Sequence, residues 1–93
     1  MIRNFKCKET EKLFRRFNSR KFPPDIKRSA IRKLWMINAA ININDLRIPP
    51  SNHLEKLNGD RADQLSIRIN EKWRVCFSWI DGNAHNVEII NYH

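Results

Sequence analysis

The spacing of apolar residues changes half-way along this chain, and that change limits the possible folds more than any other feature. One apolar stripe has steps of three and four residues, as on the core-facing side of a helix, and comprises Ile26, Ala30, Leu34, Ile37 and Ile41. Trp35 widens the stripe. Beyond residue 64 the period becomes two, with apolar and polar residues alternating over residues 65–69 and 75–79. Helices followed by a strand meander predict an α+β domain.

Local signals set the ends of the expected elements. Pro23-Pro24-Asp25 predicts the start of the main helix, because proline suits the first turn and an acid suits its positive end. A shorter helix is expected from residue 8, with Phe17 on its inner face, and a short strand over residues 2–6. Turns are expected at Glu71-Lys72 and Asp81-Gly82-Asn83. We therefore predict a single domain, residues 1–93, with two N-terminal helices on one face of a mostly antiparallel sheet.

Alternation along the strands assigns a second, polar group of residues to the other face of this sheet. If the apolar residues point to the helices, the polar group points away from them, and it comprises Ser66, Arg68, Arg74, Cys76 and Ser78. On the last strand, Tyr92 shares its parity with Glu88. We expect an open face carrying arginines and a tyrosine, a surface suited to handling phosphate.

Charge is concentrated in the first third of the chain. The 18 Lys and Arg against 10 Asp and Glu give a formal charge of +8. Twelve of these cations but only three of the acids fall in residues 1–34, a balance of +9, whereas the remainder carries −1. A polyanionic partner is expected, and nucleic acid fits best, although an acidic protein remains an alternative.

Other features narrow the class of protein. Cys7 and Cys76 are too few for a disulfide scaffold, and their spacing matches no zinc motif, so we expect free thiols in a reducing cytoplasm. The sequence shows no signal peptide and no apolar run of membrane-spanning length. We expect a cytoplasmic protein without a membrane segment, metal site or cofactor.

Three short motifs occur in a specific order. Leu57-Asn58-Gly59-Asp60-Arg61 comes first, the Trp73-Arg74 pair with Phe77 follows, and Tyr92-His93 ends the chain. In this order the motifs resemble the RelE/ParE superfamily of bacterial toxins, and most of all its HigB branch, the plasmid maintenance killer proteins. The likeness extends over essentially the whole chain.

The resemblance implies a RelE-like fold and the toxin role of a type II toxin–antitoxin pair. Such a toxin is a ribosome-dependent endoribonuclease that cuts messenger RNA in the A site. Its implied partners there are the messenger RNA and the 16S ribosomal RNA of the ribosome. It needs no metal, because the 2′-hydroxyl of the RNA attacks the neighbouring phosphorus. The implied partner is a HigA-like helix-turn-helix antitoxin, through which alone the toxin reaches operator DNA.

The resemblance also implies roles for particular residues. Arg74 stabilises the scissile phosphate, Tyr92 stacks on or orients a base, and His93 transfers a proton. Glu55 replaces a family histidine and is a candidate general base. His53, two residues earlier, is the other candidate, because the same strand parity would let both side chains face the cleft. Asn91 replaces a frequent aspartate, which with Glu55 predicts a weak or slow enzyme.

Further residues are expected to bind RNA rather than react with it. They are Arg61, Arg68, Lys56, Asn91 and His53. For Arg61 a second interpretation stays open, in which it braces its loop by pairing with Asp60 or Asp63. Two other functions also remain: a ParE-like gyrase inhibitor without catalysis, and a basic nucleic-acid-binding module.

Overall fold

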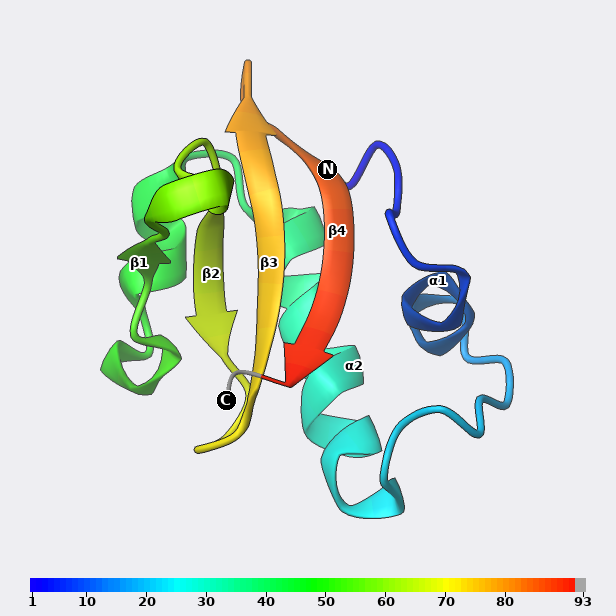
Figure 1. Ribbon diagram of the computed structural model, residues 1–93. Helices are drawn as coiled ribbons and strands as arrows, with labels where there is room; N and C mark the ends of the chain where they lie inside the picture. The colour runs from blue at the N-terminus through cyan, green and yellow to red at the C-terminus, as the bar shows by residue number, and fades with distance from the viewer. Residues whose placement is uncertain (92–93) are drawn as a thin grey trace.

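The computed structural model describes residues 1–91 and has two helices followed by a four-stranded antiparallel sheet (Figure 1). The helices are α1 (Lys8–Phe14) and α2 (Pro24–Ala39), and the strands are β1 (Glu55–Lys56), β2 (Leu65–Arg68), β3 (Trp73–Ile80) and β4 (Asn83–Asn91). Short 3₁₀ helices are η1 (Ile43–Arg47), η2 (Pro50–Asn52) and η3 (Gly59–Arg61). The strands lie in the order β1-β2-β3-β4, each antiparallel to its neighbour. The predicted α+β architecture is confirmed.

The core lies between α2 and the sheet. Helix α2 begins with Pro24 in its first turn and Asp25 near its N-terminus, as predicted. Four members of the predicted stripe are at most 2% exposed, namely Ile26, Ala30, Leu34 and Ile37. They share one apolar cluster with residues of β2, β3 and β4 that are also buried, namely Ile67, Val75, Phe77, Ala84, Val87 and Ile89. Figure 1 shows α2 behind the sheet and α1 beside β4.

Three apolar residues predicted to face the core do not lie in it. Helix α1 ends at Phe14, and Phe17 is 64% exposed because Arg16 has a left-handed backbone (φ 63°) that turns the chain away. Ile41 lies beyond the end of α2 and is 86% exposed. Trp35 is 42% exposed and stacks on Phe14, with 4.4 Å between ring centroids. The inward placement of Phe17 and Ile41 was therefore wrong, and that of Trp35 only partly right.

The N-terminal segment lies along the outer edge of β4 without forming a continuous strand. Two isolated parallel bridges join Ile2 to Ala84 and Phe5 to Val87. The backbone N–H of Arg3 donates to the carbonyl of Ala84 at 2.8 Å. The predicted strand over residues 2–6 is thus reduced to two contacts, which still occupy hydrogen-bonding groups of an edge strand.

Both predicted turns between the long strands are present. Asp81 and Gly82 have φ of 51° and 76°, and positive φ at both positions gives the turn that matches the twist of a two-residue hairpin. At the other end of β3, the side-chain oxygen of Asn70 accepts the backbone N–H groups of Lys72 and Trp73 at 2.8 and 2.9 Å.

A β-bulge in β4 determines which residues of this strand face the helices. The pairing shifts between Cys76, which lies opposite Glu88, and Ser78, which lies opposite His85. Asn86 has a left-handed backbone (φ 55°) at the shift. The extra residue places Glu88 on the same face as Cys76, so the bulge determines which side chains of β4 lie on the side of the sheet away from α2.

Candidate active site

Two rows of directly opposed residues cross the face of the sheet that points away from α2. One row runs over all four strands and comprises Glu55, Ser66, Cys76 and Glu88. The neighbouring row comprises Arg68, Arg74 and Ile90. Directly opposed residues share a face, so the grouping predicted from alternation is confirmed. We call these seven residues, with Ser78, the polar face.

The prediction that this face is open was wrong. Ser66 and Cys76 are 0% exposed, Ser78 5% and Arg74 7%. Two contacts lie over this face: Arg61, in η3 before β2, reaches across β2 and β3 to Glu88 on β4, and the backbone of His53, after η2, binds Arg74. Figure 1 shows η3 in front of the start of β2. Strand alternation indicates where a side chain points, but it does not reveal a loop that folds back over it.

Arg74 is held in a fixed orientation within the polar face. Its Nε donates to the Ser66 hydroxyl at 2.8 Å, and its Nη2 donates to the backbone carbonyl of His53 at 2.6 Å. The Glu55 carboxylate lies 3.9 Å from the same Nη2, with its own side chain 53% exposed. Because two different acceptors bind two nitrogens of a rigid planar group, the guanidinium is pre-oriented.

Arg61 is anchored by the carboxylate of Glu88, which the sequence did not predict as its partner. Its Nη1 donates to Glu88 Oε1 at 2.8 Å and to Gln64 Oε1 at 3.0 Å. Lys6 Nζ lies 3.8 Å from the same glutamate oxygen. Within residues 1–91 the ion pairs of Arg61 include neither Asp60 nor Asp63, so those two partners were wrong, although the idea of a loop brace was right.

Cys76 lies in the middle of the polar face, and its thiol is unreactive near neutral pH. Burial raises the pKa of its thiol from 9.0 to about 11; Glu88 raises it as well, whereas Arg61 and Arg74 oppose the rise. A thiol with so high a pKa stays protonated near neutral pH and is a poor nucleophile. Its place is therefore structural, beneath Arg61.

The other predicted site residues divide between the two sides of the sheet. Arg68 is half-buried and lies directly opposite Arg74, so two cations share one row. Lys56 pairs with Leu65 and is exposed, which puts it on the side away from Glu55. Asn91 pairs with Trp73 and alternates with Ile90, so it too points away from Arg74. The structure does not bring Lys56 or Asn91 to the polar face.

His53 contributes its backbone carbonyl to the site, and it does not lie in a strand as predicted. It follows η2 with a left-handed backbone (φ 44°), so the parity it was predicted to share with Glu55 does not exist. Its side chain is exposed, and its carbonyl accepts the Nη2 of Arg74. Tyr92 and His93, predicted to carry base stacking and proton transfer, lie outside the described residues.

Neither a metal cluster nor a membrane helix occurs in the described part of the chain. Among residues 1–91 no group of three or more His, Cys, Asp or Glu side chains converges as metal ligands would. Within the same residues, no helix has both the length and the apolar character needed to cross a bilayer.

Comparison with known proteins identifies the family of this chain. Residues 3–93 match the family described as the RelE-like toxin of the type II toxin–antitoxin system HigB. This chain belongs to the HigB toxin family. It is 43% identical to Toxin HigB-1 of Vibrio cholerae over 67 residues, which are 72% of this chain and 70% of that protein. It is 30% identical to Endoribonuclease HigB of Proteus vulgaris over 93 residues, all of both chains.

Membership of this family indicates the class of toxin to which the chain belongs. It is a type II toxin, and such toxins act with an antitoxin partner. The Proteus vulgaris relative bears the name of an endoribonuclease, which places the chain in a family of ribonuclease toxins.

Sequence reasoning missed the contacts of three groups that shape the site. Ser66 and Glu88 were placed by alternation, but their bonds to Arg74 and Arg61 join residues distant in sequence. The third is the carbonyl of His53, for which the sequence carries no signal, because every residue has a backbone carbonyl.

Proposed function

We propose that this protein is a ribosome-dependent endoribonuclease that cuts messenger RNA in the A site and thereby stops translation and growth. The observation that carries the proposal is Arg74: a nearly buried arginine with its guanidinium oriented by Ser66 and His53 beside the carboxylate of Glu55. The family match and the endoribonuclease relative support the same reaction class.

The chemistry uses a group of the substrate as nucleophile. The 2′-hydroxyl of RNA loses its proton to a base and attacks the adjacent phosphorus, after which the bond to the 5′-oxygen of the next nucleotide breaks and that oxygen takes up a proton. The phosphorane in between carries extra negative charge. Arg74 stabilises that charge, and its fixed orientation means that little reorganisation is needed when the charge develops. No metal enters these steps.

The general base is assigned to Glu55, with His53 as the second candidate. Glu55 lies in the same row as Ser66 and within 3.9 Å of Arg74, so a phosphate bound to Arg74 brings a neighbouring 2′-hydroxyl close to it. The side chain of His53 is exposed near the same place. Tyr92 and His93 keep their predicted roles in base stacking and in protonation of the leaving group.

The charges of the polar face support dependence on the ribosome. Arg61, Arg68 and Arg74 share this region with Glu55 and Glu88, so the local charge is nearly balanced. A nearly balanced site binds free RNA weakly. The strongly basic residues 1–34 instead provide contacts with 16S ribosomal RNA, which then presents the message to Arg74.

The proposed antitoxin partner and the proposed low rate of cleavage follow from the resemblance to the same family. A HigA-like helix-turn-helix antitoxin neutralises the toxin and makes the contact with operator DNA. Glu55 stands in place of a histidine, and Asn91, whose amide can hydrogen-bond but cannot take up a proton, stands in place of an aspartate; both replacements give a weak or slow enzyme.

Induction of the toxin in growing cells, followed by mapping of transcript 5′ ends, tests the reaction. The proposal predicts new 5′ ends only within translated reading frames. None are expected in untranslated transcripts or in cells in which the initiation of translation is blocked. Intact transcripts with a DNA-damage response would instead support gyrase as the target and contradict the proposal.

Metal independence is tested with purified toxin and ribosomes programmed with a defined message. Magnesium maintains the ribosome, so transition metals are removed by a chelator with low magnesium affinity. Cleavage is expected to continue unchanged. Loss of cleavage that added zinc or manganese restores would overturn this part of the proposal.

A further inference from the structure

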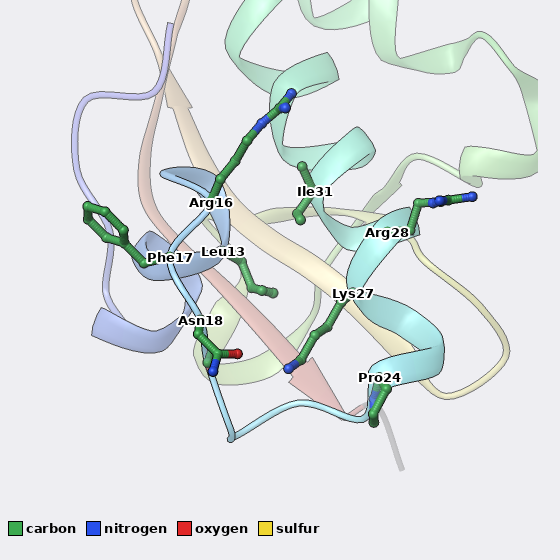
Figure 2. Close-up of a pocket in the computed structure, with 9 residues that line it drawn as sticks. Leu13, Arg16, Phe17, Asn18, Pro24, Lys27, Arg28 and Ile31 are labelled. Atoms are coloured by element: carbon green, nitrogen blue, oxygen red, sulfur yellow. The ribbon is translucent and has the colours of Figure 1, made fainter.

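An open groove lies between α2 and the segment that follows α1. Its volume is about 690 Å³, within the size range of sites that bind small ligands or anchoring side chains. Figure 2 shows Leu13 and Lys27 pointing into the space between the two segments, with Ile31 on α2. We call this the α1–α2 groove, lined by Leu13, Arg16, Phe17, Pro24, Lys27 and Ile31 among others.

One aromatic side chain at this groove is held out of the core by backbone hydrogen bonds. The N–H of Phe17 donates to the carbonyl of Lys12 at 2.8 Å, and the N–H of Arg16 donates to that of Leu13 at 3.0 Å. This pair of bonds, with Arg16 at φ 63°, is the Schellman ending of a helix. Phe17 is consequently fixed at 64% exposure. Figure 2 shows the ring of Phe17 on the side of the turn away from α2, so this exposed aromatic forms the outer margin of the groove, where a partner can contact it.

The charge around the groove is of one sign. Among residues 1–91, its lining includes Arg16, Lys27 and Arg28 and no acidic residue. None of these three cations belongs to an ion pair formed within residues 1–91. Residues 15–33 hold eight Lys and Arg against the single acid Asp25. Charge complementarity therefore requires an acidic occupant.

The apolar walls favour a polypeptide over RNA. Leu13, Pro24 and Ile31 are aliphatic, and Phe17 is the one aromatic residue among the described residues that line the groove. Single-stranded RNA is instead bound by stacking on several aromatic rings. An aliphatic floor with basic margins matches an amphipathic helix whose apolar side chains alternate with Asp and Glu.

We propose that the α1–α2 groove is the docking site for an acidic amphipathic segment of the antitoxin. The inference rests on the part of the proposed function that gives this toxin an antitoxin. It does not depend on the chemistry at Arg74, which lies on the other face of the sheet from α2. Apolar residues of the segment fill the groove over Leu13 and Ile31 and reach Phe17 at its outer margin. Its acids pair with Arg16, Lys27 and Arg28.

Affinity measurements on folded variants test the proposal. The probe is the purified antitoxin encoded beside the toxin gene, titrated into full-length toxin. The groove variants are Phe17→Ser and Lys27→Glu. The matched controls are Ile41→Ser, at an apolar residue 86% exposed outside the groove, and Lys72→Glu, in the exposed β2–β3 turn. Far-ultraviolet circular dichroism confirms that each variant is folded.

Both groove variants are expected to weaken antitoxin binding at least tenfold, with both controls within twofold of the parent. Lys27→Glu should also flatten the dependence of affinity on salt, because one charge pair is lost. Hydrogen exchange in residues 13–31 should slow when the antitoxin binds.

Two other results separate failure of this inference from failure of the proposed function. If the antitoxin binds the parent tightly and both groove variants equally well, the groove is not its docking site. If the groove variants lose ribosome affinity and keep antitoxin affinity, the groove binds RNA and the inference is overturned. If the antitoxin does not bind the parent at all, the partner given in the proposed function is wrong as well.

Discussion

Replacing Cys76 by alanine should change how the stability of the protein depends on alkaline pH. Cys76 is fully buried between Ser66 and Glu88, and burial raises the pKa of its thiol from 9.0 to about 11. A folded-state pKa above the unfolded value means that the folded protein retains the proton longer. The resulting stability is fully present below about pH 9 and is lost as pH rises toward about 11.

The size of the effect follows from the two pKa values. At about 1.4 kcal/mol per pKa unit, the gap between 9.0 and about 11 corresponds to a total of about 3 kcal/mol. Proton linkage places about 2 kcal/mol of this loss between roughly pH 7.5 and pH 10.5. Lys33, whose pKa is lowered by burial, contributes with the opposite sign, because its unfolded form binds more protons below pH 10.5. Its contribution is the same with or without Cys76 and cancels in the comparison.

Urea unfolding at these two pH values measures the effect. The parent protein should lose about 2 kcal/mol more than Cys76→Ala, whatever offset the alanine causes at the lower pH. Cys7→Ala is the control, since that half-exposed thiol lies outside the polar face. It should keep the alkaline loss or enlarge it, because the pKa of Cys7 is lowered and its contribution has the opposite sign. Equal losses in the parent and in Cys76→Ala would refute the reasoning and mean that the polar face is open to water.

Two further perturbations test how the polar face is held. A double-mutant cycle of Arg61→Met and Glu88→Gln in urea unfolding should give a coupling energy of about 1–2 kcal/mol. The reason is the 2.8 Å bond that joins a nearly buried carboxylate to a half-exposed arginine. Additive effects of the two substitutions would mean that Arg61 does not brace the polar face. Asn86→Ala should lower the free energy of unfolding by about 1 kcal/mol, and Asn86→Gly should leave it nearly unchanged, because φ is 55° at this position. Equal free energies of unfolding for both variants would contradict a conformational origin of the effect.

The main helix and the strand parities could be predicted because they depend on local periodicity. The stripe from Ile26 to Ile37 needs only one apolar face, and the alternation around Arg74 needs only a pleated strand. Phe17 was misplaced because the helical spacing continues in the sequence after Arg16 has already reversed the backbone. Periodicity reports which residues suit a helix, but the end of α1 depends on a left-handed arginine that few sequence rules anticipate.

The site was harder to predict because its contacts are distant in sequence. Residue types and alternation were enough to place Arg74 and Glu55 on one face. The burial of that face depends on Arg61 crossing two strands to reach Glu88, and the orientation of Arg74 depends on a backbone carbonyl at His53. Both contacts result from tertiary packing of the loop and of η2, for which the sequence has no periodic signal.

The central claim is that Arg74 stabilises the phosphate being cleaved. The most direct test is the single-turnover rate of message cleavage on purified, programmed ribosomes by Arg74→Lys, which keeps the charge but loses the planar group bound by Ser66 and His53. Arg68→Lys, at the directly opposed position, is the matched control, and circular dichroism with antitoxin binding confirms that both variants are folded. The account predicts a rate about 100-fold lower for Arg74→Lys and a change of less than about fivefold for Arg68→Lys. A folded Arg74→Lys protein that cuts at the parental rate would contradict it.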